Sequence, residues 1–184
     1  MYDVLFHNAL VVSPAPGASA ARVVADGIVG VSGGRIAALG PKDSLPLLPP
    51  AVETVDAGGG ILLPGLINTH SHLPMALFRG LADDLPLQTW LSEHIFPAEA
   101  QHVDPESVRL GAMLACAELL LSGTTTCCDG YFFEDSVVEA AAEVGLRAVL
   151  GQGVIDFPAP GVPDPAQNVL TAEDFVTRWQ GVYD

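Results

Sequence analysis

The sequence predicts an α/β protein in which a small β unit precedes a parallel sheet covered by helices. Residues 1–60 contain short strand patterns separated by turns, and residues 61–184 alternate strands with helices. Between them, the almost continuously apolar run from Ile61 to His72 is typical of a strand buried on both faces of a parallel sheet. Strands that alternate with helices return the chain by crossover connections, which favours parallel pairing. We therefore place a domain boundary after residue 60.

The first 60 residues predict a small antiparallel β unit. Its strand candidates are Val4–Val12, Ala25–Ser32 and Arg35–Leu39. Gly33 and Gly34 separate the last two, and paired glycines adopt the positive φ angles of a two-residue hairpin turn. A proline-rich connection, Pro41 to Pro50, and the glycines at 58–60 then lead to the apolar run.

The apolar run ends in two histidines separated by one residue. Side chains alternate along a strand, so His70 and His72 are expected on one face and Ser71 on the other. Two imidazoles on one face can bind one cation, and the catalytic face of parallel α/β folds lies at the carboxyl ends of the strands. The pattern therefore predicts His70 and His72 as metal ligands, and it favours them over the alternative of two ordinary surface histidines.

A long segment, Leu73 to Val103, follows the histidines. Loops of this length in compact domains are usually functional or disordered. Helical spacing within it predicts an amphipathic helix that covers a site, through Leu87, Trp90, Leu91, His94 and Ile95. From the residues alone, Trp90 could simply pack and Glu99 could be a solvated carboxylate.

Strand–helix units continue to the end of the chain. Asp104 and Pro105 predict the start of a helix that Gly123 ends. The later elements are expected at Thr124–Asp129 (strand), Ser136–Val144 (helix), Leu146–Gly151 (strand) and from Thr171, with Asp174, onward (helix). A complete eight-unit barrel takes roughly 250 residues. The pattern therefore predicts either a small open sheet or the first part of a longer protein.

Composition narrows the class of partner. The chain has 184 residues and a net charge of -15, from 7 basic and 22 acidic residues, which argues against nucleic acid or an anionic membrane and for a small-molecule ligand. The 3 cysteines form neither a C-x-x-C pair nor an even framework, as in a reducing compartment. The first residues do not resemble a signal peptide. We expect a soluble, cytoplasmic protein.

Several segments resemble a known family. Pro64-Gly65-Leu66-Ile67-Asn68-Thr69-His70-Ser71-His72 resembles the first barrel strand of the amidohydrolase superfamily. Within that superfamily, five segments are similar to the 5-methylthioadenosine/S-adenosylhomocysteine deaminase branch: Leu77–Leu87, Thr89–Leu91, Ile95–Glu99, Leu119–Thr126 and Gly145–Ala148. Triazine chlorohydrolases and guanine deaminases share much of this pattern.

The resemblance implies a fold and a site. The family fold is a distorted (β/α)8 TIM-type barrel with a small β domain assembled from both chain ends. Residues 1–60 would be the N-terminal part of that composite β domain, and residues 61–184 the N-terminal portion of the barrel. His70 and His72 would be the first two ligands of a divalent metal, usually zinc. Trp90 and Glu99 would contact the substrate, with Glu99 accepting hydrogen bonds from ribose hydroxyls.

The resemblance also implies an activity for the full-length protein. That activity is metal-dependent hydrolytic deamination of an aminopurine nucleoside such as 5-methylthioadenosine or S-adenosylhomocysteine, and a homo-oligomer is compatible with it. The alternatives are a chlorohydrolase or free-base deaminase of the same superfamily and, in a different class, a non-catalytic fragment or split subunit.

The chain departs from the family pattern in two ways, and the first of them motivates the last alternative. The family completes its metal site with further histidines and an aspartate, and it moves protons with a glutamate, all expected beyond residue 184. We therefore expect the chain alone to be inactive. In addition, the segment Gly151-Gln152-Gly153 lacks the arginine with which some relatives hold substrate.

Overall fold

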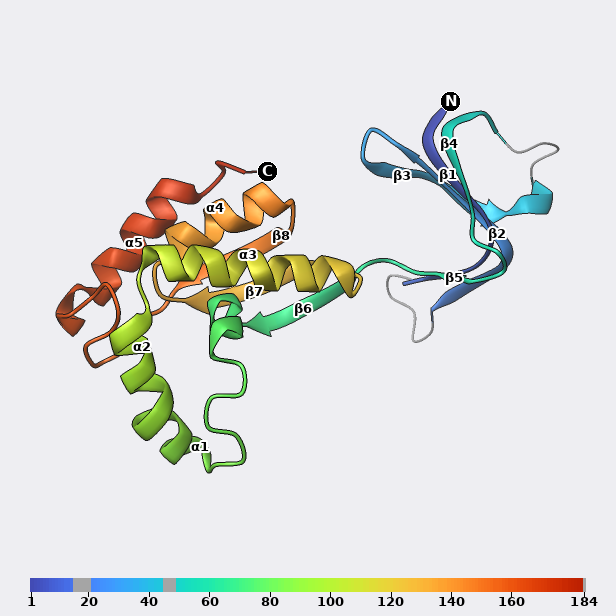
Figure 1. The fold of residues 1–184 in the computed structure, drawn as a ribbon. Coiled ribbons are helices and arrows are strands. Elements are labelled where there is room, and N and C mark those ends of the chain that lie inside the picture. The colour runs from blue at the N-terminus through green and yellow to red at the C-terminus, as the bar shows by residue number, and fades with distance from the viewer. Residues whose placement is uncertain (15–20, 45–48, 184) are drawn as a thin grey trace. The chain divides into compact units, whose positions relative to one another are not determined.

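The computed structural model describes residues 1–14, 21–44 and 49–183, and the chain forms two compact units, Met1–Pro64 and Gly65–Asp184 (Figure 1). The division falls after Pro64, whereas the sequence analysis placed the boundary after residue 60. Each unit has its own sheet, with five strands among the described residues of the first and three among those of the second. No helix in the described part of the chain combines the length and hydrophobicity that a bilayer crossing requires.

The first unit is a mixed five-stranded sheet in the order β3-β2-β1-β4, with β5 also paired to β1. Its strands are β1 (Tyr2–Ser13), β2 (Arg22–Ser32), β3 (Arg35–Pro41), β4 (Ala51–Asp56) and β5 (Ile61–Leu62). β1, β2 and β3 pair in antiparallel fashion, but β4 and β5 run parallel to β1. The prediction of a purely antiparallel unit was therefore wrong for β4 and β5.

The turn signals of the first unit behave as expected. Gly33 and Gly34 join β2 to β3 with φ angles of 57° and 71°, which confirms the predicted hairpin. The proline-rich connection contains a 3-10 turn, η1 (Lys42–Ser44), and its residues 45–48 lie outside the described part of the chain. The core of this unit is a cluster of small aliphatic side chains: Ala9, Val11, Val24 and Val29.

The apolar run is not one strand. It divides into β5 in the first sheet and β6 (Leu66–Ser71) in the second. The division is physical, because Pro64 has no N–H to donate to a ladder. A Cβ at Gly65 would also lie 2.2 Å from the hydroxyl oxygen of Thr125, so the close approach to the neighbouring strand requires glycine. The histidines still lie at the carboxyl end of a parallel strand, as predicted.

The second unit is a parallel sheet in the order β6-β7-β8. Its other strands are β7 (Thr124–Tyr131) and β8 (Arg147–Gln152), and its main helices are α3 (Pro105–Leu121), α4 (Glu134–Val144) and α5 (Asn168–Trp179). α3 and α4 pack together and bury a continuous core against β7 that includes Val108, Ala112, Cys116, Cys127 and Val137. The predicted alternation of strands and helices is confirmed here.

The starts of α3 and α5 can be compared with the capping residues predicted from the sequence. The side chain of Asp104 accepts a hydrogen bond from Ser107 N (2.8 Å), which confirms the predicted start of α3. The predicted cap at Thr171 is wrong. α5 begins at Asn168, so Thr171 lies inside the helix and its hydroxyl donates to the carbonyl of Gln167 (3.0 Å). The capping side chain comes earlier, from Asp164, at the 3-10 turn η4 (Pro165–Gln167).

The long segment after the histidines folds into two helical parts. The first is the 3-10 helix η2 (Leu73–Phe78), and the second is continuous through α1 (Leu87–Thr89), the π-helix η3 (Trp90–Ile95) and α2 (Phe96–His102). The second part confirms the predicted helix, but Leu87 is 69% exposed and does not belong to its buried face. Ile95 and Glu99 are its buried residues, at 2% and 5% exposure.

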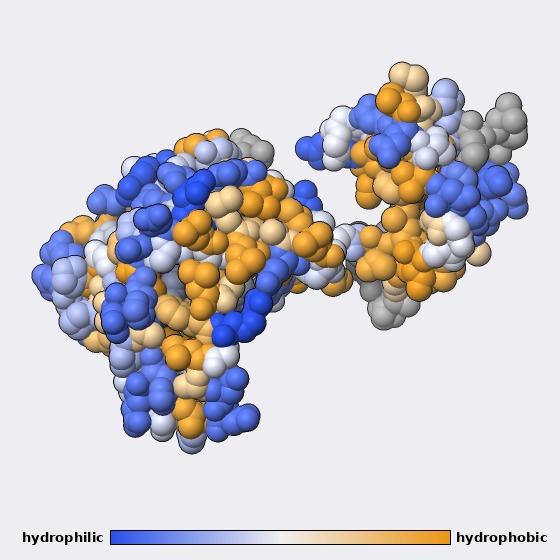
Figure 2. Space-filling model, in the orientation of Figure 1, coloured by the Kyte–Doolittle hydropathy of each residue, from blue (hydrophilic) through white to orange (hydrophobic). Residues whose placement is uncertain are grey.

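Among the described residues β6 and β8 are the edge strands of the second sheet, and the side chains of β6 are more exposed than the predicted burial on both faces. Leu66, Ile67 and Val149 are 53%, 64% and 65% exposed, and Figure 2 shows hydrophobic residues at the surface of the larger unit. Open strand edges and exposed aliphatic side chains favour association.

We expect light scattering of the isolated 184-residue chain to rise with concentration in about the micromolar range. Val149→Lys on β8 should reduce this rise, and a chain that stays monomeric at all concentrations would contradict the prediction.

Candidate active site

Three consecutive residues at the carboxyl end of β6 form hydrogen bonds to β7. The hydroxyl of Ser71 donates to the carbonyl oxygen of Cys128 (2.8 Å), Nδ1 of His72 lies 2.5 Å from the carbonyl oxygen of Gly130, and Leu73 N donates to Oδ1 of Asp129 (2.6 Å). We call this set of contacts the β6–β7 corner. It fixes the backbone on both sides of His72.

The two predicted metal ligands lie together at this corner. The rings of His70 and His72 have centroids 5.1 Å apart and planes inclined by 79°. A carbonyl oxygen only accepts hydrogen bonds, so Nδ1 of His72 carries a proton in this contact, and in the neutral ring Nε2 is then the nitrogen that can bind a metal. Metal-binding histidines are commonly held in this way, by donation of the other ring N–H to a carbonyl. This donor arrangement therefore fits a divalent metal.

The two histidines do not complete a metal site. Fixed zinc usually has three or four protein ligands. Within residues 1–14, 21–44 and 49–183 no group of three or more His, Cys, Asp or Glu side chains is arranged to hold a metal ion. The corner can thus supply two imidazole ligands, and the other donors have to come from elsewhere.

Asp129, which accepts the hydrogen bond from Leu73 N at the corner, forms a buried carboxyl pair with Glu134. The two residues are 6% and 0% exposed. Within the described part of the chain, Oδ2 of Asp129 and both carboxyl oxygens of Glu134 have no hydrogen-bond partner. Burial first, and then the charge of Asp129, raise the pKa of Glu134 to about 9. Glu134 is therefore protonated at neutral pH and is able to donate to Asp129.

The carboxyl pair was missed in the sequence analysis. Asp129 appeared there only as the end of a predicted strand, although the carboxyl end of a central parallel strand is itself a signal for functional residues. The sequence did not mark Glu134 as a functional residue. A glutamate is common in the first turn of a helix, where its charge interacts favourably with the helix dipole.

Glu99, predicted to contact substrate, lies close to the corner. It is only 5% exposed, so the alternative of a solvated carboxylate is wrong. The hydroxyl of Tyr131 donates to its Oε1 (2.7 Å), and the Tyr131 ring is 6.2 Å from that of His72. Burial raises the pKa of Glu99, and the hydrogen bond from Tyr131 opposes this shift. Tyr131 lies two residues past the predicted end of its strand and was not predicted as a site residue.

Glu99 and Trp90 occupy different surroundings. Glu99 lines a cavity of about 370 Å³ between α2 and the segment that follows β8. Trp90 lies at the first residue of η3, is half-buried and is not among the residues that line this cavity. A substrate contact by Trp90 stays a prediction.

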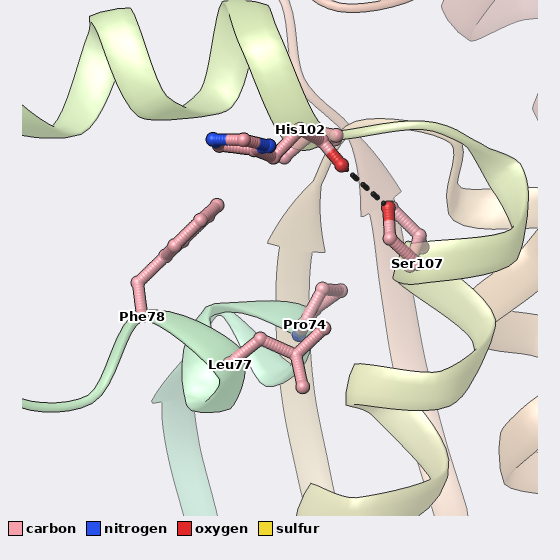
Figure 3. Close-up of a pocket in the computed structure, with 7 residues that line it drawn as sticks. Pro74, Leu77, Phe78, His102 and Ser107 are labelled. Carbon is pink, nitrogen blue, oxygen red and sulfur yellow. Dashed lines mark hydrogen bonds between the residues drawn. The ribbon is translucent and has the colours of Figure 1, made fainter.

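A second cavity, of about 150 Å³, lies between η2, the end of α2 and the start of α3 (Figure 3). The side chains of Phe78, Pro74 and Leu77 line one side of it, and His102 lines the other. The Ser107 hydroxyl donates to the His102 carbonyl oxygen (3.0 Å). None of the predicted site residues lines it. Its small size and mainly apolar walls make it a packing defect rather than a second active site.

Comparison with known proteins identifies the family. The family model described as the amidohydrolase family matches residues 61–182. The chain is 47% identical over 178 residues to a 5-methylthioadenosine/S-adenosylhomocysteine deaminase of Syntrophobacter fumaroxidans, covering 97% of this chain and 40% of the relative. It is 41% identical over 182 residues to a 5′-deoxyadenosine deaminase of Methanosarcina mazei, covering 98% and 40%.

A solved structure agrees with this assignment. An adenosine deaminase from Xanthomonas campestris, crystallised with bound zinc, superposes with a TM-score of 0.88 at 37% identity, over 98% of this chain and 40% of that protein. The chain thus spans about 40% of the length of the relatives it matches. Its second unit consists of the first strand–helix units of a (β/α)8 barrel. The family match over residues 61–182 shows that the chain belongs to the amidohydrolase family.

Proposed function

We propose that a protein containing this chain hydrolytically deaminates an aminopurine nucleoside, such as 5-methylthioadenosine or S-adenosylhomocysteine, with a divalent metal, zinc, held partly by His70 and His72. The observation that carries the proposal is the β6–β7 corner, where the Gly130 carbonyl fixes Nδ1 of His72 and leaves Nε2 for a metal. The names of the relatives support the choice of substrate.

The chain's own residues have distinct tasks in this proposal. When bound, a divalent metal supplies Lewis acidity and makes water a better nucleophile near neutral pH. His70 and His72 would hold that metal at the β6–β7 corner. Glu99 accepts hydrogen bonds from the ribose hydroxyls, and Tyr131 orients its carboxylate by donating to Oε1. The general acid that protonates the departing ammonia is expected outside these 184 residues.

We also propose a cytoplasmic location and leave a homo-oligomer as a prediction. Cys116 and Cys127 are free and buried, which supports a reducing compartment. Burial raises their thiol pKa values to about 11 and about 12, so both are expected to be unreactive at neutral pH.

The test of the proposed function is a chimeric enzyme. Residues 1–184 of this chain replace the matching segment of the Syntrophobacter fumaroxidans relative, of which the chain covers 40%, and the relative supplies the remainder of the barrel. We expect stoichiometric zinc and release of ammonia from 5-methylthioadenosine. A folded chimera that is inactive on aminopurine nucleosides but dechlorinates a triazine would move the assignment to the alternative activity.

Asp129 offers a test of the corner. In the chimera, Asp129→Ala removes the acceptor of Leu73 N and frees the backbone after His72, so we expect zinc affinity to fall by about 10-fold to 100-fold. Asp129→Asn keeps an oxygen acceptor and should lose less. Zinc competition with a chelating dye measures both. Equal affinities for the two variants would show that the hydrogen bond to Leu73 does not position His72.

A further inference from the structure

The 3-10 helix η2 begins directly after His72, so contacts that hold η2 also hold this proposed metal ligand. The carbonyl oxygen of His72, the N-cap residue of η2, accepts a hydrogen bond from Met75 N (2.9 Å). Leu73, the first residue of η2, is 4% exposed, and its N–H donates to Asp129 Oδ1 (2.6 Å). Movement of η2 would therefore displace the backbone of His72.

Helix α3 contacts η2 at Gly111, a buried residue in the middle of α3. A Cβ atom at Gly111 would lie 2.7 Å from the carbonyl oxygen of Pro74, 3.0 Å from Cα of Pro74 and 3.1 Å from Cγ of Leu77. Figure 3 shows Pro74 and Leu77 on the side of η2 that faces α3. The two nearest atoms belong to the backbone, so rotation of a side chain cannot make room. A larger residue at position 111 requires η2 to move.

Glycine at position 111 is unfavourable for α3 itself. Glycine loses more backbone entropy than alanine when a helix forms, which makes it a weak helix former. The φ angle of Gly111 is not in the left-handed region, so the backbone conformation of α3 does not require glycine. The close contact with η2 is therefore the structural reason for glycine here.

The end of η2 is attached to α3 as well. Arg79, the residue that follows η2, donates two hydrogen bonds to the carboxylate of Glu118 on α3 (3.0 and 2.6 Å). The two side chains are 65% and 44% exposed, so the pair contributes little to the overall stability. It still limits where the last turn of η2 can lie.

We propose that α3 positions His72 through η2, with Gly111 as the residue that permits the contact and the Arg79–Glu118 pair as its second attachment. The inference rests on the proposed function, because His72 is a proposed metal ligand. Gly111 and the ion pair act through the position of η2 and are assigned no contact with metal or substrate. The β6–β7 corner holds His72 from the sheet, and α3 holds it from the helical layer.

Gly111→Ala in the chimera tests the proposal. The added methyl group displaces η2, so we expect zinc affinity, measured by competition with a chelating dye, to fall by about tenfold. Helix propensity alone predicts a more stable protein with unchanged zinc affinity. The visible spectrum of the cobalt-substituted chimera should also change, because it depends on the arrangement of the ligands around the ion.

Val137→Ala is the control for lost stability. Val137 is 0% exposed in the same core but lies on α4, and its truncation destabilises the fold by leaving a cavity. The zinc affinity and the cobalt spectrum of this variant should stay unchanged. An equal loss of zinc affinity in Gly111→Ala and Val137→Ala would overturn the proposal, since destabilisation alone would then explain both.

A charge reversal tests the same contact in case Gly111→Ala does not fold. Arg79→Glu places two carboxylates together at the end of η2, and we expect zinc affinity to fall by about twofold to fivefold. Glu118→Arg in the same chain brings opposite charges together again and should restore the affinity. An unchanged affinity in Arg79→Glu, or a loss that Glu118→Arg does not reverse, overturns the proposal.

Hydrogen exchange separates failure of this proposal from failure of the proposed function, because it needs no metal. The amides of Leu73–Phe78 should exchange about tenfold faster in Gly111→Ala but not in Val137→Ala, once rates are corrected for global stability. Faster exchange in a chimera that binds no zinc supports the positioning of His72 by α3 and overturns the metal site. Unchanged exchange overturns the positioning, and so does faster exchange that leaves the affinity of a zinc-binding chimera intact.

Discussion

Replacing His72 by alanine in the chimera should abolish zinc retention and lower kcat/KM by more than about 100-fold. The estimate follows because loss of a residue that merely supports a metal ligand already costs about 10-fold to 100-fold, and His72 is proposed as a ligand itself. His70→Ala should have a similar effect, since the two rings are only 5.1 Å apart and are proposed to bind the same ion. Metal analysis after gel filtration and ammonia release measure the two consequences separately.

His102→Ala is the matched control for these variants. His102 is also an exposed histidine of the second unit, but it lies in the cavity between η2, α2 and α3 and not at the β6–β7 corner. Its replacement should leave zinc content unchanged. A His72→Ala chimera with full zinc and full activity would remove the basis of the proposed metal site.

Glu134→Gln should stabilise the folded protein at pH 8 much more than at pH 5. In the unfolded chain Glu134 ionises near its ordinary pKa of 4.5, but in the folded chain burial raises the pKa to about 9. Folding therefore requires uptake of a proton between these values, and the folded state loses stability as pH rises through this window. At pH 8 the cost is on the order of a few kcal/mol, and glutamine avoids it because it does not ionise.

The midpoint of thermal unfolding of the chimera, measured at both pH values, checks this prediction. Glu139→Gln is the control, because Glu139 lies on the same helix but is exposed. It should change the midpoint little at either pH. An equal shift in Glu134→Gln at pH 5 and pH 8 would mean that Glu134 is not protonated in the folded protein at neutral pH.

Local sequence signals predicted most elements of the second unit. Asp104 and Gly123 bound α3 as expected, because capping and left-handed glycine are decided by a few neighbouring residues. The predicted cap at Thr171 was wrong because another nearby residue, Asp164, caps the turn that leads into α5. Proline has no N–H for a strand ladder, so Pro64 could have predicted the division of the apolar run. The run was predicted as one strand because its hydrophobicity is almost continuous.

The candidate site was predictable where it depends on alternation along one strand and not where it depends on contacts across the fold. His70 and His72 follow from spacing along β6. Whether Glu99 receives the hydroxyl of Tyr131, and whether Glu134 is buried beside Asp129, depends on the packing of α2, β7 and α4. The parallel position of β4 was missed for a similar reason, because pairing with β1 joins distant parts of the chain.

The β6–β7 corner has a consequence for biosynthesis. All of its donors and acceptors lie between Ser71 and Gly130, and the helices that cover this part of the sheet end at Val144. Because domains begin to fold from the N-terminus during synthesis, both histidines can reach their final positions while later residues are still on the ribosome. Two donors of the metal site would then be set early, and residues made afterwards would join a geometry that already exists.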